Sequence, residues 1–294
     1  MIVGGGPAGL SAALVLARCR RRVLVCDEGR PRNEASRAVH NFLSREGTSP
    51  TELLRLARRQ LAPYAVEIRD ERVVSAVRRS SGFAVRLAGG GRVRGRKLLI
   101  ATGIRDNCPE IEGIGAMIGR GVYYCSYCDG YTVRDRPLVA LGRGIAGANL
   151  ALALTTWSRD VTYCTNGTRR PRAGVCARLA ACGIPVIAAP LARVEGGRRL
   201  EAVVTRRGRR IPCAGLFIQE GDRQQSDLAE RLGCRLTRRG SVRTDKTGRT
   251  TVPSLYVAGD AADDARAVIV AAATGAKAAF AINEELRKEA RRLP

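Results

Sequence analysis

A glycine-rich unit occurs twice in this chain, and the repeat limits the folds that the chain can adopt. Residues 1–27 read as a short apolar strand, the run GGGPAG, a helix rich in Ala and Leu, and a second apolar strand. Residues 138–165 follow the same plan around the run GRGIAG. The offset stays at 138 positions from the first glycine of each run to the second strand. Two separate βαβ nucleotide-binding units are the simplest account of this repeat.

In each unit the glycine run lies between an expected strand and an expected helix, as phosphate binding requires. The first glycine allows a tight turn, the second lets the backbone approach a pyrophosphate, and the third lets helix and strand pack closely. The N-terminus of the helix then faces the anion. A glycine-rich turn that binds no ligand is the alternative for each run.

The rest of the chain alternates strands and helices, which indicates an α/β fold of two Rossmann-like domains, the second inserted into the first. A buried strand at 98–103 ends in small residues, and 251–261 leads into a last Ala-rich helix that ends near Lys288. We therefore predict a discontinuous first domain, 1–107 and 221–294, around an inserted domain, 108–220. Further strands are expected at 66–76, 83–87, 185–188, 202–205 and 216–218.

The charge of the chain is strongly basic, with 51 Lys and Arg against 27 Asp and Glu and a net charge of +24. Of the basic residues, 47 are Arg and 4 are Lys, and they occur in every segment. A coding bias that replaces Lys by Arg explains this pattern. Aromatic residues make up only 4% of the chain, which leaves few stacking platforms for bases, so we expect no nucleic-acid partner. The basic surface would attract an acidic protein, and salt would weaken that attraction.

The ten cysteines and the hydropathy indicate a cytoplasmic protein. Disulfide scaffolds are typical of secreted chains of under about 100 residues, and this chain has 294. The longest apolar stretches, such as Ala267–Ala273, are too short to span a bilayer, and no charged region precedes an apolar one at the N-terminus. We therefore expect no membrane association and mostly reduced thiols.

The stretch CSYCDG at residues 125–130 is the most informative chemical motif. It has no second cysteine pair at zinc spacing, and the only histidine, His40, is remote, so we expect no metal site. Cys125 and Cys128, just before a nucleotide unit, favour a redox-active disulfide, with two idle thiols as the alternative. If the segment opens a helix, its exposed N–H groups would lower a thiolate pKa. Asp129 could carry a proton to or from the departing thiolate, or it could be a simple helix cap.

These motifs together resemble the low-molecular-weight thioredoxin reductases, a family of FAD-dependent pyridine nucleotide-disulfide oxidoreductases. The matching features, in order, are the first glycine run, Ala101–Gly103, the cysteine pair followed by Asp129, the second glycine run and the stretch 251–260. The resemblance extends over essentially the whole chain. It implies an FAD-binding first domain, an inserted domain that binds NADP(H) or NAD(H) and carries the cysteine pair, and a homodimer.

The resemblance also implies roles for individual residues. Cys128 would face the flavin, Cys125 would exchange with the substrate, and Asp129 would donate the proton. Asp27 would accept the adenosine ribose hydroxyls, and Asp260 would lie toward the ribityl chain. The candidate FAD residues are Gly4, Gly6, Pro7, Ala8, Gly9, Asp27, His40, Asn41, Ala101, Thr102, Gly103, Gly259, Asp260 and Ala267. The candidate pyridine nucleotide residues are Gly142, Gly144, Ile145, Ala146, Gly147, Arg169 and Arg170. For His40, an ordinary surface position is the alternative.

The chain departs from the family pattern at three places. Where NADPH-dependent members have His-Arg-Arg, this chain has Thr165–Gly167, and its basic residues come later, at 169, 170 and 172. The Arg-Gln pair expected before the last helix reads Arg266–Ala267, which removes one flavin contact. Only three residues precede Gly4, which suggests either a truncated start or a naturally clipped edge.

The functional hypothesis is an FAD-dependent disulfide oxidoreductase that passes electrons from NAD(P)H through FAD and the Cys125–Cys128 disulfide. Its acceptor would be a thioredoxin-like protein or a small disulfide. One alternative is a flavin-dependent dithiol oxidase that passes electrons from a small dithiol to oxygen, and another is a reductase with a donor other than a nicotinamide. A non-catalytic nucleotide-binding sensor is the alternative from a different functional class.

Overall fold

The computed structural model describes residues 1–262 and 265–291, and the chain divides into two compact units. The first unit comprises residues 1–34, 41–105 and 222 onward, and the second comprises 35–40 and 106–221. The sequence placed residues 35–40 with the first domain, whereas they pack with the second unit. A Cβ added at Gly119 would overlap the carbonyl oxygen of Ala35, so this glycine permits the close approach.

The first unit is built on a parallel sheet of five strands in the order β18-β7-β1-β2-β3. Ile2 pairs with Val25 on one side and with Leu99 on the other, so the two-residue strand β1 forms the centre of the sheet. The strands are β1 (Ile2–Val3), β2 (Val23–Cys26), β3 (Val66–Arg69), β7 (Leu98–Ile100) and β18 (Leu255–Val257).

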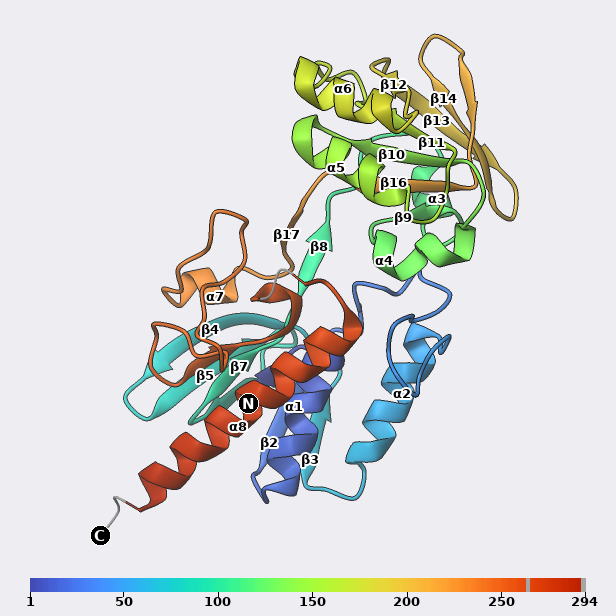
Figure 1. The fold of residues 1–294 in the computed structure, drawn as a ribbon. Helices are drawn as coiled ribbons and strands as arrows, with labels where there is room; N and C mark the ends of the chain where they lie inside the picture. Colours follow the sequence, from blue (N-terminus) through green and yellow to red (C-terminus); the bar gives the residue numbers. More distant parts are fainter. Residues whose placement is uncertain (263–264, 292–294) are drawn as a thin grey trace. The chain divides into compact units, whose positions relative to one another are not determined.

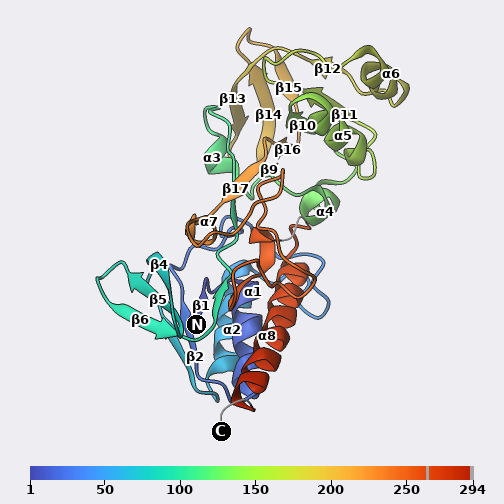
Figure 2. The ribbon, with the colours of Figure 1, turned by 90° about the vertical axis from the view of Figure 1, so that its left-hand side faces the viewer.

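Helices cover one face of this sheet, and a small second sheet covers the other (Figures 1 and 2). The close packing of α1 against α8 depends on Gly275, where a Cβ would overlap the carbonyl oxygen of Ala8. The helices of this face are α1 (Pro7–Arg18), α2 (Pro50–Leu61) and α8 (Val268–Ala290). The short α7 (Leu228–Arg231) and η2 (Gly259–Ala261) contribute buried residues to the core on the other face, with the small sheet.

The second sheet of this unit corrects one strand prediction. The expected strand 66–76 is wrong as a single element, because the chain leaves the parallel sheet after Arg69 and starts again at Val73. The later segment begins an antiparallel sheet of β4 (Val73–Arg79), β5 (Gly82–Leu87) and β6 (Arg92–Gly95). The sequence reading missed β6, whose RVRG pattern leaves every side chain at least partly exposed.

The second unit contains another parallel sheet, in the order β12-β11-β10-β16-β9. Its centre is completely buried, and Val139, Tyr163 and Phe217 have no exposed surface. The strands are β9 (Val122–Tyr123), β10 (Leu138–Gly142), β11 (Val161–Cys164), β12 (Val186–Ile187) and β16 (Gly215–Gln219). An antiparallel sheet adds β13 (Leu191–Gly196), β14 (Leu200–Thr205) and β15 (Arg210–Pro212), of which only β14 was expected.

The helices of the second unit are α3 (Ile114–Met117), α4 (Ser126–Asp129), η1 (Gly130–Val133), α5 (Gly144–Leu154) and α6 (Ala173–Ala181). The chain passes between the units four times: before and after residues 35–40, at the end of β8 (Ile104–Asp106) and at the start of β17 (Asp222–Gln224). Strands β8 and β17 pair with each other as a two-stranded sheet. The expected linker 107–109 follows β8 directly. Within the described residues, no helix has both the length and the apolar composition to cross a membrane.

Candidate functional site

Cys125 and Cys128 form a disulfide in the second unit, with their Cα atoms 5.3 Å apart. Cys125 is the N-cap of α4, and its Sγ accepts a hydrogen bond from the backbone N–H of Cys128 at 3.1 Å. The segment therefore opens a short helix, and a backbone donor points at the Cys125 sulfur. Such a donor stabilises a thiolate at Cys125 when the disulfide is reduced.

The Asp129 carboxyl follows the disulfide directly and has an unusual pKa. Burial raises the pKa of Asp129 to about 6, while the positive charge of a protonated His40 acts in the opposite direction. A carboxyl group with this pKa can give and take a proton near neutral pH. Asp129 makes no side-chain cap hydrogen bond at the start of η1, so the geometry does not support the alternative of a simple cap there.

The two residues expected at 40 and 41 belong to different units. His40 lies in the second unit, where its charge acts on Asp129, and Asn41 lies in the first. Asn41 adopts a φ of 60°, and its backbone N–H donates to the Glu46 carboxylate at 2.8 Å. The boundary between the two units therefore falls between these two residues.

The first glycine turn leaves space for a ligand only at its centre. A Cβ at Gly4 would overlap the carbonyl oxygen of Ala101, and a Cβ at Gly9 would overlap that of Gly4. A Cβ at Gly6 would meet nothing within 4 Å. Gly6 is also the N-cap of α1, which begins with Pro7 and continues through Ala8. The helix N-terminus therefore faces open space, as an anion site requires.

Asp27 closes one side of this turn. Its Oδ1 accepts a hydrogen bond from the backbone N–H of Gly5 at 2.9 Å, and its Oδ2 pairs with Arg58 at 2.9 Å. Arg58 comes from α2 and also pairs with Asp70 at 2.7 Å. Arg58 is a site residue that the sequence does not indicate, because nothing local to α2 shows that this arginine reaches the end of β2.

Two further segments complete the neighbourhood of the first turn. Ala101 donates its N–H to the carbonyl of Val3, and Gly103 turns the chain with a φ of 71°. The hydroxyl of Thr102 is buried and has no hydrogen-bond partner among the residues that the structure describes. A buried hydroxyl without a partner is costly, so Thr102 marks a place where a ligand atom would be favourable.

The segment before α8 carries the other expected residues of this unit. Gly259 has a φ of 73° and donates its N–H to the Thr274 hydroxyl at 3.0 Å. The Asp260 carboxylate pairs with Arg32 at 2.9 Å, a partner that the sequence reading did not identify. Ala267 is the N-cap of α8, and the preceding residue, Arg266, forms an ion pair with Asp222 at 3.2 Å.

The second glycine turn has the same backbone plan as the first. A Cβ at Gly147 would lie 2.6 Å from the carbonyl carbon of Gly142, and Gly144 has a φ of 53° with open space beside it. The Tyr163 hydroxyl donates to the carbonyls of Gly142 and Gly144 at 3.2 and 3.1 Å, which holds the turn in place. Ile145 is 64% exposed, and Ala146 is also exposed.

The end of β11 carries no charged group. Thr165 is completely buried, and its hydroxyl donates to the backbone carbonyl of Thr168. The hydroxyl of Thr168 in turn donates to the backbone carbonyl of Thr165. Asn166 accepts a hydrogen bond from the backbone N–H of Leu191 at 3.0 Å. Arg169 and Arg170 are exposed, and Arg170 donates to the carbonyl of Val186 at 3.4 Å.

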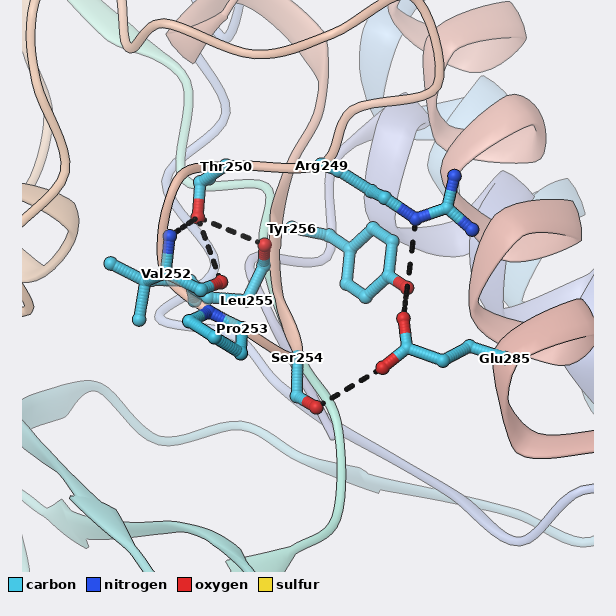
Figure 3. A pocket seen from close by; sticks show the side chains of 8 residues that line it. All are labelled: Arg249, Thr250, Val252, Pro253, Ser254, Leu255, Tyr256 and Glu285. Carbon is cyan, nitrogen blue, oxygen red and sulfur yellow. Dashed lines mark hydrogen bonds and ion pairs between the residues drawn. The ribbon is translucent and has the colours of Figure 1, made fainter. Parts of the chain in front are cut away.

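A small polar cavity of about 210 Å³ lies elsewhere in the first unit, between β18 and α8 (Figure 3). Its polar side chains mostly bond to one another: Tyr256 and Ser254 both donate to the Glu285 carboxylate. The buried Lys97, which is 4% exposed, also donates to Glu285. This cluster joins α8 to the sheet, and no predicted site residue belongs to it.

Comparison with known proteins identifies the family. The model of the pyridine nucleotide-disulphide oxidoreductases matches residues 1–276 of this chain. The chain belongs to that family. It is 35% identical over 176 residues to thioredoxin reductase tcpT of Claviceps purpurea, which covers 57% of this chain and 55% of the relative. It is 29% identical over 296 residues to a thioredoxin reductase of Mycolicibacterium smegmatis, covering 95% of this chain and 94% of the relative.

The solved structures agree with this membership. The crystal structure of HlmI superposes with a TM-score of 0.93 and 35% identity, covering 98% of this chain and 92% of HlmI. The chain spans 43–58% of the length of the first curated relatives that it matches. The resemblance to the low-molecular-weight thioredoxin reductases and the α/β fold with two Rossmann-like domains are confirmed.

Proteins of this family use FAD and a pyridine nucleotide, and the residues present fit both groups. For FAD, the open space at Gly6, the partnerless Thr102 hydroxyl and the acceptor Asp27 make a cradle that a Cβ at Gly6 would fill. For the pyridine nucleotide, the open space beside Gly144 at the start of α5 makes the equivalent cradle. Within the described residues, no group of three or more His, Cys, Asp or Glu could hold a metal ion.

Proposed function

We propose that this chain is an FAD-dependent disulfide oxidoreductase of the thioredoxin reductase type. The observation that carries the proposal is the Cys125–Cys128 disulfide beside Asp129, whose pKa is raised to about 6. FAD, when bound, would accept electrons from a pyridine nucleotide and pass them to a disulfide. The cysteine pair would supply the disulfide, and the two glycine turns would bind the two nucleotides.

The cysteines would transfer the electrons by thiol–disulfide exchange. After reduction, the Cys125 thiolate attacks one sulfur of the substrate disulfide, forms a mixed disulfide and releases the first substrate thiolate. The Cys128 thiolate then attacks the Cys125 sulfur, which restores the protein disulfide and releases the second substrate thiolate. Two electrons have then moved from the protein dithiol to the substrate. Asp129 would give a proton to a departing thiolate, because its carboxyl group is partly protonated near neutral pH.

The partner, the assembly and the location belong to the same proposal. A thioredoxin-like protein or a small disulfide would be the substrate, as the names of the thioredoxin reductase relatives suggest for those proteins. The net charge of +24 would favour an acidic partner and make the encounter sensitive to salt. We further propose a homodimer that acts in the cytoplasm.

The end of β11 favours a second candidate, a flavin-dependent dithiol oxidase. Thr165 and Thr168 bond to each other there, where an NADPH-dependent protein needs a cationic group for the 2′-phosphate. In this direction a small dithiol would reduce the Cys125–Cys128 disulfide, and oxygen would be the final electron acceptor. Steady turnover with NADPH and a thioredoxin supports the reductase, and turnover with a dithiol and oxygen alone supports the oxidase.

The cysteine pair gives the direct test of the proposed function. Cys125→Ser and Cys128→Ser should each lower disulfide turnover at least about 100-fold while FAD stays bound. Only Cys125→Ser should show a thiolate–flavin charge-transfer absorption band, because it leaves Cys128 free. The matched control is Cys182→Ser, which changes an exposed free cysteine of the same unit. Unchanged turnover in both variants would refute the proposal, and the band in Cys128→Ser alone would reverse the two roles.

A further inference from the structure

The second unit has a carboxylate at the topological switch point of its parallel sheet, where the strand order reverses. From β10 the chain crosses through α5 to β11 on one side, while β16 lies against β10 on the other side. In such sheets the ligand crevice lies between these neighbouring strands, at their carboxyl ends. Gly142 ends β10 beside this crevice, and Glu220 follows the last residue of β16. Glu220 is therefore part of the nucleotide crevice by topology.

Glu220 and Arg143 form an ion pair between the carboxyl ends of β10 and β16. The Nε of Arg143 lies 3.0 Å from Oε2 of Glu220, and the side chains are 68% and 11% exposed. The other carboxylate oxygen, Oε1, is buried and has no hydrogen-bond partner among the residues that the structure describes. The carboxylate is thus only half satisfied. Arg143, by contrast, is largely in solvent and could turn away at little cost.

The charges around the turn oppose each other. Arg143 is the N-cap of α5, whose eleven residues direct the positive end of their helix dipole toward the crevice. That end attracts a pyrophosphate, and a free Arg143 guanidinium would add to the attraction. The Glu220 carboxylate repels the same anion and also holds the guanidinium. The turn cannot easily rearrange to avoid Glu220, because the Tyr163 hydroxyl holds the carbonyls of Gly142 and Gly144.

We propose that Glu220 lowers the affinity of this unit for its pyridine nucleotide. Glu220 keeps a negative charge in the crevice and holds Arg143 in an ion pair, so a dinucleotide must displace Arg143 from Glu220 before its pyrophosphate can bind well. Glu220 should lower the affinity for NAD(H) and for NADP(H) by the same factor. The two nucleotides differ only in the 2′-phosphate, which would lie at the end of β11, whereas Glu220 follows β16. This inference rests on the proposed function, since it concerns the electron donor of the same enzyme.

The test measures binding of NAD⁺, NADP⁺ and ADP-ribose to the oxidised, FAD-loaded protein by calorimetry. Glu220→Gln should bind all three about tenfold more tightly than the unchanged protein, and Glu220→Asp, which keeps the charge, should not. Arg143→Ala in the Glu220→Gln background should remove the gain. The matched control is Glu201→Gln, which removes an exposed carboxylate from β14 of the same unit and should leave the affinities unchanged.

Two outcomes would overturn the inference. Equal affinity in Glu220→Gln, with unchanged flavin content and thermal unfolding, would show that the ion pair is only structural. Weaker binding in Glu220→Gln would show that Oε1 accepts a hydrogen bond from the nucleotide. Either failure can be told apart from failure of the proposed function, because reduction of the Cys125–Cys128 disulfide by a small dithiol needs no nucleotide and is measured separately.

Discussion

The two glycine turns share one backbone plan but differ in the charges that surround it. In both turns the third glycine lies so close to the first that a side chain at Gly9 or Gly147 would clash. In both, a cysteine is the last residue of the second strand. The next residue differs: Asp27 in the first turn is a charged acceptor, whereas Thr165 in the second is buried and neutral.

The second turn has its carboxylate on another strand. Glu220 follows β16 and pairs with Arg143, which lies inside the glycine run itself. An acceptor at the end of the second strand suits ribose hydroxyls. In our proposal, the Glu220 carboxylate lies instead against the pyrophosphate. The glycines therefore set the shape of each turn but not the charges around it. In our proposal, one or two side chains at neighbouring strand ends set the affinity and selectivity of each nucleotide site.

The largest effect is expected from the third glycine of the first turn. In Gly9→Ala the new methyl group would overlap the carbonyl oxygen of Gly4, so the turn cannot form and the purified protein should lack FAD. Gly6→Ala is the matched variant, because its methyl group meets no protein atom within 4 Å. It should fold normally and still bind FAD at least about tenfold more weakly. Flavin content and thermal unfolding measure both, and a Gly9→Ala protein with full flavin would contradict the shared plan.

The next effect concerns the acid beside the disulfide, which only the second unit has. Asp129→Asn should lower disulfide turnover about 100-fold, because the proton donor is removed. In the unchanged protein the acid form is lost as the pH rises through about 6, so the rate of the step that needs this proton should fall above that pH. The variant should lack this dependence.

The same group affects stability in the opposite sense to an ordinary surface aspartate. Because folding raises the pKa of Asp129 from 3.8 to about 6, the folded state binds more protons between these values. The free energy of unfolding should therefore contain a contribution that falls as the pH rises from about 4 to 6. Asp129→Asn should remove this contribution, and the exposed Asp160→Asn should not. Identical pH profiles for the Asp129 variant and the unchanged protein would contradict the assignment.

A moderate effect is expected at the acceptor of the first turn. Asp27→Asn keeps an oxygen for the backbone N–H of Gly5 but loses the charge, so FAD should bind about tenfold more weakly in a fluorescence titration. Asp70→Asn is the control, since Asp70 is the other partner of Arg58 and is 70% exposed. If both variants weaken FAD equally, Arg58 rather than Asp27 would be the residue that matters.

A smaller effect is expected at the end of β11. With neither a carboxylate nor an arginine at the usual position, the second turn should show little preference for NADPH over NADH. Arg169→Ala combined with Arg170→Ala should change the two affinities by less than about threefold, because we expect neither arginine to contact the 2′-phosphate. Loss of a bidentate charged contact would instead lower the NADPH affinity by about one to two decades. Strong NADPH selectivity that disappears in the double variant would show that these arginines fold over the site. Selectivity that survives it and Arg172→Ala would show that other groups hold the phosphate.

The smallest effect is expected at the equivalent cysteines of the two turns. Cys26 and Cys164 end β2 and β11, and burial raises the pKa of each thiol, that of Cys164 to about 12. Neither forms a thiolate near neutral pH, so Cys26→Ala and Cys164→Ala should leave turnover within a few-fold. The other free cysteines, including Cys19 and Cys176, should behave alike. Loss of activity at Cys164 or Cys176 alone would reveal a second redox relay in the second unit.

Much of the site was predictable because it is local in sequence. The glycine runs, Cys125 with Cys128, and the small residues after β7 each do their work through neighbouring backbone, so spacing alone indicates them. Arg58, Arg32 and Glu220 escaped the sequence reading for the opposite reason. Each pairs with a residue that lies 31 or more positions away in the sequence. Charged residues are common in this chain, so no local pattern distinguishes these three from the others.

By itself, the sequence determined the repeat, the order of the elements and the chemistry of the disulfide, because these depend on periodicity and on short-range geometry. The tertiary structure decided which charges meet. It attached residues 35–40 to the second unit, gave Asp129 its raised pKa through burial, and paired Arg143 with Glu220 across two strand ends. Burial and ion pairing depend on what surrounds a group in space, and a linear pattern carries no record of those surroundings.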